Sequence, residues 1–503
     1  MMRAMGWLKG LRRDERGNTL AIMATAFLPI AGMMGSGLDM SRAYMAKAKL
    51  QTACDSAALA TRRHMSSGFI NQAAKDEGKK FFDFNFPAGT MQAKPVTLVI
   101  AANPSNLSEV QVTASTSVPT SVMKLFGRKT LPISTACNAD QDYVNNDIML
   151  VLDVTGSMYC KQGTGINCTY QPNPVEPSRL TALRNAAGSL YDALAGAQGV
   201  RIRYGFMPYS MTVNVRSTLN ASWLRSTHKY HRCTTTDSNG CKTWNTDSAL
   251  TAPTGTGATG CIEERSDIGG LDWPIKISSA VTQADIDTVP STNAQKWPQY
   301  DVNTTTGEGN SSFGSTYSNL VSFCPAAAVK LATYASKAAF NTQVNNALAS
   351  VGGYTNHELG IIWGMRYLST TGLFAAENPA TWAVNGKQIR VDKHIIFLTD
   401  GDMTADTKNY SSYGIPNKED RLTGTAGLEQ KHKDRFANAC TRARTTGGAT
   451  VWVIALDNAN GDDTPSLKAC ASGNDHFFQT DGTNLAEIFT VIGKGIGKLR
   501  ITK

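Results

Sequence analysis

Three oxygen-bearing side chains stand at alternate positions directly after an apolar run. Asp153, Thr155 and Ser157 follow the stretch 148–152, which contains only aliphatic residues and methionine and predicts a buried strand. Alternate residues of an extended segment point to the same side, so one carboxylate and two hydroxyls can face one small ion. Hard oxygen ligands suit Mg²⁺ or Mn²⁺, with Ca²⁺ as a further candidate. The motif therefore predicts a divalent cation site at a strand end.

Two later segments offer further oxygen ligands. The glycine-led loop 352–360 runs into a predicted helix and can present the hydroxyl of Thr355. Asp400 comes just after a second apolar run, 395–398. Because few of these ligands are charged, the cation would stay electrophilic and keep a position open for a carboxylate from a partner. The predicted metal ligands are Asp153, Thr155, Ser157, Thr355 and Asp400.

A structural and an enzymatic interpretation compete with this prediction. Asp, Ser and Gly favour turns, so the hydroxyls could only cap turns while Asp400 begins a loop. His357 is predicted to start a helix and Asp402 to lie at the surface. Val154 follows Asp153 where an aspartic protease has Thr, and the sequence has no Gly-x-Ser-x-Gly, His-Glu-x-x-His or phosphate-binding loop. We therefore predict a binding protein and not an enzyme, with a metal-dependent hydrolase as the least favoured alternative.

The elements that must position these residues alternate between strand and helix from residue 147 onward. Such alternation predicts an α/β fold with a doubly wound, mostly parallel sheet, whose binding sites lie at the carboxyl ends of the strands. The predicted strands are 148–152, 201–207, 394–398, 450–456 and 476–479, and the predicted helices are 178–195, 358–367, 428–445, 466–471 and 485–499.

The stretch 214–335 breaks this alternation. It is rich in Ser, Thr, Asn and Gly, and it holds four tryptophans and four of the ten cysteines. We interpret it as a partly looped, disulfide-tied insertion on the ligand-binding side of the sheet, with disorder as the alternative. The α/β domain then consists of 147–213 and 336–503.

The N-terminal residues predict a membrane anchor. Segment 1–16 contains five Lys and Arg residues, and segment 17–38 contains no charge and is long enough to span a bilayer. The positive-inside rule would place 1–16 as a basic tail in the cytoplasm and the rest of the chain outside. A cleaved signal peptide is the alternative.

A pilin-like arrangement is predicted for the region 39–146. One long helix is expected from residue 17 to about 82, with an apolar stripe of alanines beyond the membrane segment. A small antiparallel sheet should follow, with strands at 96–100, 110–114 and 131–135 and a short helix at 122–126.

Cysteine usage indicates an exported protein. All ten cysteines follow the charge-free segment, and an even number in an exported region favours disulfides. Spacing proposes the pairs Cys160–Cys168, Cys233–Cys241, Cys261–Cys324 and Cys440–Cys470, while Cys54 and Cys137 stay unassigned. Zinc is an alternative at His228, His231, Cys233 and Cys241, although no Cys-x-x-Cys spacing supports it.

The overall composition argues against nucleic-acid binding. The formal charge of +9 is spread along 503 residues, of which 18% are charged and 41% hydrophobic. No stripe of Lys and Arg with interleaved aromatic residues occurs, so we expect no nucleic acid among the partners.

The three metal-site segments, in this order and at these strand ends, resemble the metal-ion-dependent adhesion site of a von Willebrand factor type A domain. That family has Asp-x-Ser-x-Ser, a distant Thr and a distant Asp; here Thr155 stands at the first Ser position and keeps the hydroxyl. The resemblance covers about 147–503 apart from the insertion. It implies that the hydroxyls of Thr155, Ser157 and Thr355 contact the metal, and that Asp153 and Asp400 act directly or through water.

The segments 16–22, 37–42 and 50–60 resemble Tad pilus assembly proteins of the TadG type. That family joins a pilin-like anchored segment to a von Willebrand A-type domain, and the resemblance implies a role in tight-adherence (Flp) pilus biogenesis and surface attachment. A prepilin peptidase site would want Glu five residues after Gly17, where Ile22 stands, so the anchor should remain uncleaved.

The expected partners are a protein that supplies a carboxylate, other pilin-like or Tad pilus subunits, and a membrane. The expected location is the inner membrane, crossed once, with the bulk of the chain in the periplasm or at the cell surface. An adhesin at the pilus tip that binds host or abiotic ligands is the alternative function.

Overall fold

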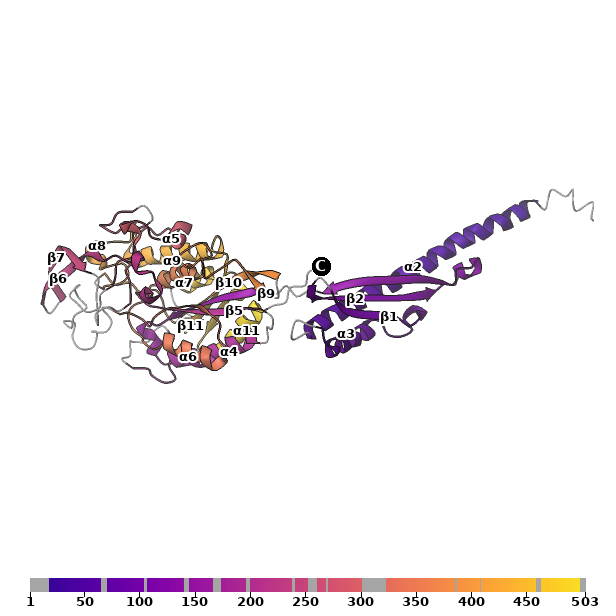
Figure 1. Ribbon diagram of the computed structural model, residues 1–503, viewed down its shortest axis with the longest axis horizontal. Coiled ribbons are helices and arrows are strands. Elements are labelled where there is room, and N and C mark those ends of the chain that lie inside the picture. The colour runs from indigo at the N-terminus through magenta and orange to yellow at the C-terminus, as the bar shows by residue number, and fades with distance from the viewer. Residues whose placement is uncertain are drawn as a thin grey trace, which may run out of the picture. The chain divides into compact units, whose positions relative to one another are not determined.

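The computed structural model forms two compact units, 1–142 with 499–503 (unit 1) and 143–498 (unit 2), which are described separately (Figure 1). The structure describes residues 18–64, 70–103, 106–139, 144–165, 173–195, 200–237, 240–251, 260–267, 270–300, 323–384, 387–407, 409–457 and 463–497.

Unit 1 contains two helices where one long helix was predicted. α2 spans Asn18–His64 and α3 spans Gln72–Asn85. The side chain of Asn71 accepts a hydrogen bond of 2.8 Å from the backbone N–H of Ala74 and so begins α3 as a new helix. α3 packs against α2, where Gly78 lies so close to Thr61 that no larger side chain fits. The prediction of a continuous helix to about residue 82 is therefore wrong, because it overlooked the capping residue.

The predicted membrane-spanning segment 17–38 is not supported by the helix that forms there. Within the part of the chain that the structure describes, no helix combines the length and apolar character needed to cross a membrane. Pro29, several glycines and the polar residues Thr25 and Ser36 dilute the apolar side chains of this part of α2. The predicted basic tail 1–16, on which the predicted orientation rested, lies outside the described residues.

A three-stranded antiparallel sheet runs alongside α2 in unit 1 (Figure 1). β1 (Thr97–Asn103), β2 (Asn106–Pro119) and β3 (Thr130–Ala139) pair in the order β1-β2-β3. The short helix η3 (Met123–Phe126) stands between β2 and β3, and a second one, η2 (Thr90–Gln92), precedes β1. The disulfide Cys54–Cys137 joins α2 to β3, a pair that sequence spacing had left open because the two cysteines are 83 residues apart.

Unit 2 is built on a mostly parallel sheet, as the strand and helix alternation predicted. Its main strands lie in the order β12-β11-β10-β4-β5-β8, and neighbouring strands are parallel except at β8. β9 adds an antiparallel pairing to the first half of β10. The bounds are β4 Asn145–Asp153, β5 Ile202–Tyr209, β8 Val329–Ala332, β9 Thr381–Val384, β10 Lys387–Thr399, β11 Ala449–Leu456 and β12 Phe477–Thr480.

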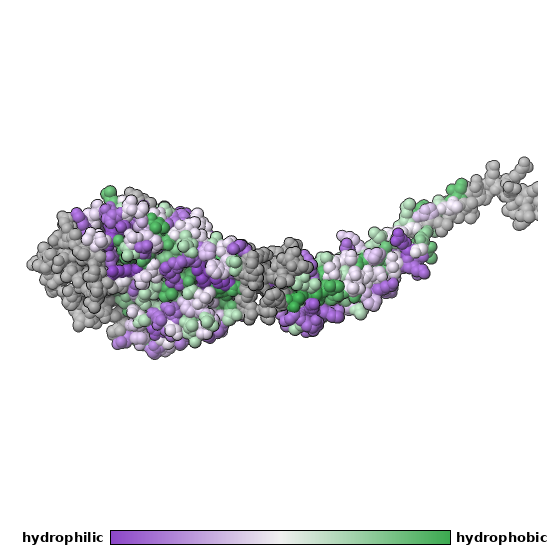
Figure 2. All heavy atoms as spheres, viewed as in Figure 1, coloured by the Kyte–Doolittle hydropathy of each residue, from purple (hydrophilic) through white to green (hydrophobic). Residues whose placement is uncertain are grey.

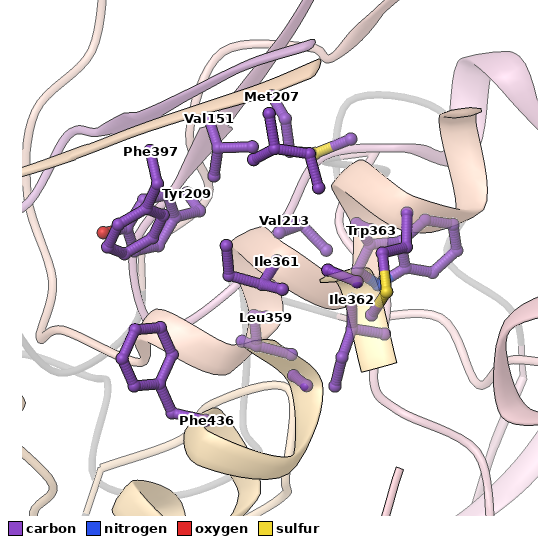
Figure 3. Packing of buried hydrophobic residues seen from close by; sticks show 14 of the residues in the cluster. Val151, Met207, Tyr209, Val213, Leu359, Ile361, Ile362, Trp363, Phe397 and Phe436 are labelled. Atoms are coloured by element: carbon purple, nitrogen blue, oxygen red, sulfur yellow. The ribbon is translucent and has the colours of Figure 1, made fainter. Parts of the chain in front are cut away.

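Helices cover both faces of this sheet because β4 and its neighbours are apolar on both sides. Ile148, Leu150 and Leu152 pack with one set of helices, whereas Met149 and Val151 pack with the other. Figure 3 shows part of the second core, in which β-strand side chains meet those of α7 and α9. The first set is α4 (Arg179–Ala195), α6 (Lys337–Ala347) and α11 (Leu485–Ile496); the second is α7 (His357–Leu368), α9 (Leu428–Arg444) and α10 (Thr464–Cys470).

The described parts of the predicted insertion belong to unit 2. β6 (Thr227–Asp237) and β7 (Gly240–Thr251) form an antiparallel pair, and the short helix α5 (Gln283–Asp287) contacts α7. Outside the insertion, a further short helix, α8, spans Pro416–Glu419. Trp297 packs on Trp363 of α7 with ring centroids 5.3 Å apart. β8 falls inside the range predicted as insertion, yet it forms the edge of the sheet.

Two disulfides of unit 2 join cysteines that sequence spacing had paired. They are Cys261–Cys324, within the predicted insertion, and Cys440–Cys470, between α9 and α10. Cys160 is also disulfide-bonded. Cys168 and the side chains of His231, Cys233 and Cys241 lie outside the described residues, so those two predicted pairs and the zinc alternative stay predictions.

Candidate metal site

The predicted metal ligands gather where the order of strands reverses. Numbered along the chain, the six main strands read 3-2-1-4-5-6 across the sheet, so the reversal falls between β4 and β10. In open α/β sheets, ligands bind in the crevice outside the carboxyl ends of the strands at this switch point. Asp153 ends β4 and Asp400 follows β10, and their neighbours Leu152 and Leu398 are paired directly. The topology therefore brings these two carboxylates to the same crevice.

The first loop folds back so that its polar side chains face Asp400. Asp153 Oδ1 accepts a hydrogen bond of 2.8 Å from the N–H of Thr155, and the short helix η4 (Gly156–Tyr159) follows. Ser157 Oγ donates to Asp400 Oδ1 at 2.7 Å and lies 3.0 Å from Thr155 Oγ1. Because the Ser157 proton points to Asp400, Ser157 Oγ has a lone pair free to accept from the Thr155 hydroxyl. Four of the five predicted ligands are thus linked in one chain of short contacts.

The fifth predicted ligand, Thr355, lies on the adjoining loop. Backbone hydrogen bonds tie that loop to the first one: Gly352 N–H donates to Val154 O at 2.9 Å, and Gly156 N–H donates to Gly353 O at 3.4 Å. Gly353 has φ of +77°, which favours glycine at this bend. Thr355 is buried, and its backbone exchanges two hydrogen bonds of 3.1 Å with Thr404. These contacts bring the Thr355 loop to the side of the first loop.

A chain of buried hydrogen bonds through Thr399 and His357 orients the carboxylate of Asp153. Thr399 Oγ1 donates to Asp153 Oδ2 at 2.7 Å, and His357 Nε2 lies 2.9 Å from the same Thr399 oxygen. Burial lowers the pKa of His357 to about 4, so the ring is neutral and its Nε2–H donates to Thr399. His357 is the first residue of α7, as predicted, but sequence reasoning missed its role and that of Thr399. The sequence did offer one sign of the role of Thr399: it directly follows a predicted strand and precedes Asp400, as Asp153 directly follows its own predicted strand.

The side chain of Arg179 brings a positive charge to the carboxylates of the site. Its guanidinium is buried at the start of α4; Nη1 donates to Asp400 Oδ2 and Nε to Asp457 Oδ2, both at 2.9 Å. This arrangement leaves Asp400 Oδ1 for Ser157. No spacing in the sequence pointed to Arg179 or Asp457, because they come together only through folding.

The electrostatics of the site favour an added positive charge. Asp153 and Asp400 are both completely buried. Burial, with a further contribution from the charge of Asp400, raises the pKa of Asp153 to about 7. Burial also raises the pKa of Asp400, although Arg179 opposes that rise. Two desolvated carboxylates and one guanidinium, itself shared with Asp457, leave excess negative charge that a divalent cation would offset.

The side chains present fit Mg²⁺ better than a metal that needs many protein ligands. The predicted set offers two carboxylates and three hydroxyls, all hard oxygen donors, and Mg²⁺ commonly keeps water in its remaining positions. Across the described residues, no group of three or more His, Cys, Asp or Glu side chains could hold a metal. Asp402, predicted at the surface, is half-buried, and its Oδ1 accepts from the N–H of Asp463 at 3.0 Å.

Comparisons with known proteins give one family match and several distant structural likenesses. No curated protein matches the chain. The pilus adhesin SpaC from Lactobacillus rhamnosus GG is 12% identical to this chain, with a TM-score of 0.34. The match covers 80% of this chain and 34% of SpaC, so this chain spans about a third of the length of SpaC. The PilB minor pilin from Streptococcus sanguinis is 12% identical (TM-score 0.31; 81% and 78% covered). The vWF domain of the type V pili tip protein Mfa5 from Porphyromonas gingivalis is 11% identical (TM-score 0.31; 70% and 95% covered).

The family match lies in unit 1. The model described as putative Flp pilus-assembly TadE/G-like covers residues 17–63, nearly all of α2. This chain therefore carries, at α2, a segment similar to the TadE/G-like Flp pilus-assembly family.

Proposed function

We propose that this chain is a pilus-associated binding protein in which unit 2 holds a divalent cation for a carboxylate of a protein partner. The observation that carries the proposal is the hydroxyl of Ser157, which links Thr155 on one strand end to Asp400 on the next, at the switch point of the sheet. The proposed ligands are Asp153, Thr155, Ser157, Thr355 and Asp400, and the proposed ion is Mg²⁺, with Mn²⁺ or Ca²⁺ as substitutes.

The proposed ligands would hold the cation, and neighbouring residues would orient the two carboxylates. Thr399 fixes one oxygen of Asp153, and the N–H of Thr155 fixes the other. Arg179 holds one oxygen of Asp400 and turns the second toward Ser157. A bound divalent cation would supply an electrophilic position that a partner carboxylate can fill. Such fixed ligands favour reversible capture of an acidic group.

The same contacts favour binding over hydrolysis. A general base must have an oxygen placed to take a proton from water. Both oxygens of Asp153 and both oxygens of Asp400 already accept hydrogen bonds from the chain. Arg179 Nη1 also donates to Asp400 Oδ2 and opposes the rise in the pKa of Asp400 that burial causes. We therefore propose that the chain is not an enzyme.

The TadE/G-like segment and the disulfides support a role at a pilus. Residues 17–63 match a Flp pilus-assembly family, so other pilus subunits are the proposed partners of unit 1. Three disulfides in the described residues favour an oxidising compartment such as the periplasm or the cell surface. The acidic partner of unit 2 would then be met outside the cytoplasm.

Calorimetric titration of the full chain with Mg²⁺ tests the site. We expect Ser157→Ala and Thr355→Ala each to weaken binding by roughly tenfold to a hundredfold, since each removes an oxygen ligand or the donor that orients one. Thr483→Ala, which alters an exposed turn of unit 2, is the matched control and should bind like the native chain. Native affinity in both site variants would refute the proposal.

Cells that carry the Ser157→Ala chain separate assembly from adhesion. Loss of pilus fibres would place the metal site in pilus biogenesis. Normal fibres with lost attachment would favour the adhesin alternative, in which the cation binds surface ligands. Normal fibres together with normal attachment would contradict both roles.

A further inference from the structure

An exposed apolar surface lies on unit 1, far in the sequence from the metal site. The first part of α2, residues 18–38, carries no charge and extends beyond the sheet (Figure 1). Phe27, Met33 and Met34 are exposed there, and Figure 2 shows hydrophobic surface on this projecting end. Next to it, η3 exposes Leu125 at 77% and Phe126 at 58%. Water contact with this much apolar surface is unfavourable, so a binding partner is expected.

The loop that carries η3 packs closely against α2 at two glycines of that helix. A Cβ added to Gly32 would lie 3.0 Å from Phe126 Cζ, and one added to Gly35 would lie 2.2 Å from Val122 Cγ1. Val122 and Phe126 therefore rest directly on the helix backbone at these positions. An open apolar hollow of about 430 Å³ between α2 and η3 includes Pro29, Met33 and Met123 in its lining. The loop and the charge-free part of α2 thus form one continuous surface.

Asp39 fixes the loop at the point where the charge-free part of α2 ends. Its carboxylate accepts hydrogen bonds from three successive backbone N–H groups, those of Ser121 at 2.6 Å and of Val122 and Met123 at 2.8 Å. The donors at Met123 and Ser121 lower the pKa of Asp39 and keep it ionised. Arg42 adds a hydrogen bond to Ser121 Oγ at 3.3 Å. The loop is therefore held at a fixed level along the helix.

Basic side chains flank the apolar tip of this loop. Lys124 precedes Leu125 and Phe126, and Arg128 and Lys129 follow the turn at Gly127, whose φ is +85°. All three basic residues are exposed. Apolar side chains framed by Lys and Arg are the composition of a segment that rests at a membrane interface and binds anionic lipid. A second copy of the chain would bring the same three positive charges against each other, which opposes self-association through this tip.

We propose that the loop 121–129 docks on an anionic lipid surface. Leu125 and Phe126 enter the boundary between headgroups and acyl chains, and Lys124, Arg128 and Lys129 contact lipid phosphates. The exposed side chains of the charge-free part of α2 lie on the same apolar surface. This membrane contact is independent of the metal site proposed for unit 2.

A fluorescent label at the loop tip tests the contact in the full chain. L125C carries the label nitrobenzoxadiazole, and F84C, at a residue of α3 that is 83% exposed, carries it as the matched control. Vesicles of mixed phosphatidylcholine and phosphatidylglycerol should shift the L125C emission to shorter wavelength and leave F84C unchanged. An L125C label that stays in water while the chain binds vesicles would overturn the proposal, as would failure of the chain to bind them.

Charge reversal and a concentration series complete the test. The triple variant K124E/R128E/K129E should weaken binding to the mixed vesicles at least about tenfold, with an unchanged unfolding temperature. Unchanged vesicle binding by this variant would overturn the lipid contact. A wavelength shift of the L125C label on raising the protein concentration without vesicles would also overturn it, because a second copy would then cover the tip.

Discussion

The two units place charge and apolar surface in opposite ways. Unit 2 buries charged groups: Asp153, Asp400 and Arg179 lie under the loops of the sheet, and Arg366 is buried with Glu264. The projecting part of unit 1 does the reverse, since it exposes apolar side chains such as Leu125 and keeps its basic residues at the surface.

Each arrangement is unfavourable in water for a different reason, and each points to a different partner. Buried carboxylates lose hydration, and a cation restores the lost stabilisation. Exposed apolar surface orders water around it, and a lipid phase removes it from water. This difference indicates that unit 2 is suited to bind a charged group. The charge-free part of α2 and the loop 121–129 of unit 1 are suited to contact lipid. The predictions below test whether that contrast holds.

The largest expected effect comes from breaking a buried ion pair of unit 2. Arg366 Nη1 donates to Glu264 Oε1 at 2.9 Å, and both side chains are buried. Arg366→Met should lower the free energy of unfolding by roughly 3–5 kcal/mol, because it leaves the Glu264 carboxylate buried without its cation. Urea unfolding followed by tryptophan fluorescence measures the change.

Lys79→Met is the matched variant in unit 1. Lys79 pairs with Asp83 one turn away on α3, and both side chains are exposed to water. Losing this pair should change stability by at most about 0.5 kcal/mol. Equal effects of the two variants would remove the contrast between buried and exposed charge.

A smaller effect on the free energy of unfolding is expected from the protonation of one buried histidine as the pH falls. Burial lowers the pKa of His394 in β10 from 6.5 to about 3, and the ring bonds to Asn146 and Trp452. Between these pH values the unfolded chain binds more protons, so this contribution to stability is present above about pH 6.5 and is lost as the pH falls toward 3. His394→Gln should reduce the loss between pH 7 and 4.5 by up to roughly 3 kcal/mol.

The comparison of native chain and variant isolates His394 from other groups. Asp153 acts in the opposite direction, because its raised pKa lets the folded chain bind more protons. An identical pH dependence in the native chain and in His394→Gln would contradict the buried neutral ring.

A smaller loss of stability than that of Arg366→Met is expected at Asp39 in unit 1. Asp39→Ala removes the acceptor for the N–H groups of Ser121, Val122 and Met123 and should lower stability by about 1–2 kcal/mol. Hydrogen exchange of these three amides should speed up while the amides of β2 stay protected. Unchanged exchange at residues 121–123 would show that Asp39 does not hold the loop.

The sequence predicted those features that depend on short stretches of chain. Period-two spacing after an apolar run placed Asp153, Thr155 and Ser157 at a strand end, and the alternation of strands and helices predicted the parallel sheet. Arg179 was missed because the start of a helix approaches Asp400 only through the packing of α4 on the sheet. Thr399 was missed because its hydrogen bond to Asp153 depends on the alignment of β10 with β4.

Failures in unit 1 have the same origin. The helix was extended past Asn71 because the alanine-rich pattern outweighed one capping residue. Cys54 and Cys137 could not be paired because the contact between α2 and β3 is long-range. The absence of charge and the length of 17–38 predicted a membrane span, which the apolar character of α2 does not support. The contacts of the loop 121–129 with Gly32 and Gly35 could be seen only in the folded chain.

The most direct test of the metal site is a crystal of the full chain grown with Mn²⁺, measured near the manganese absorption edge. The proposal predicts one strong anomalous peak beside Ser157 Oγ and Thr155 Oγ1, between the carboxylates of Asp153 and Asp400. The peak should disappear in Ser157→Ala crystals grown in the same way. Anomalous density only elsewhere, or none at this crevice when Mn²⁺ saturates the chain in solution, would contradict the account.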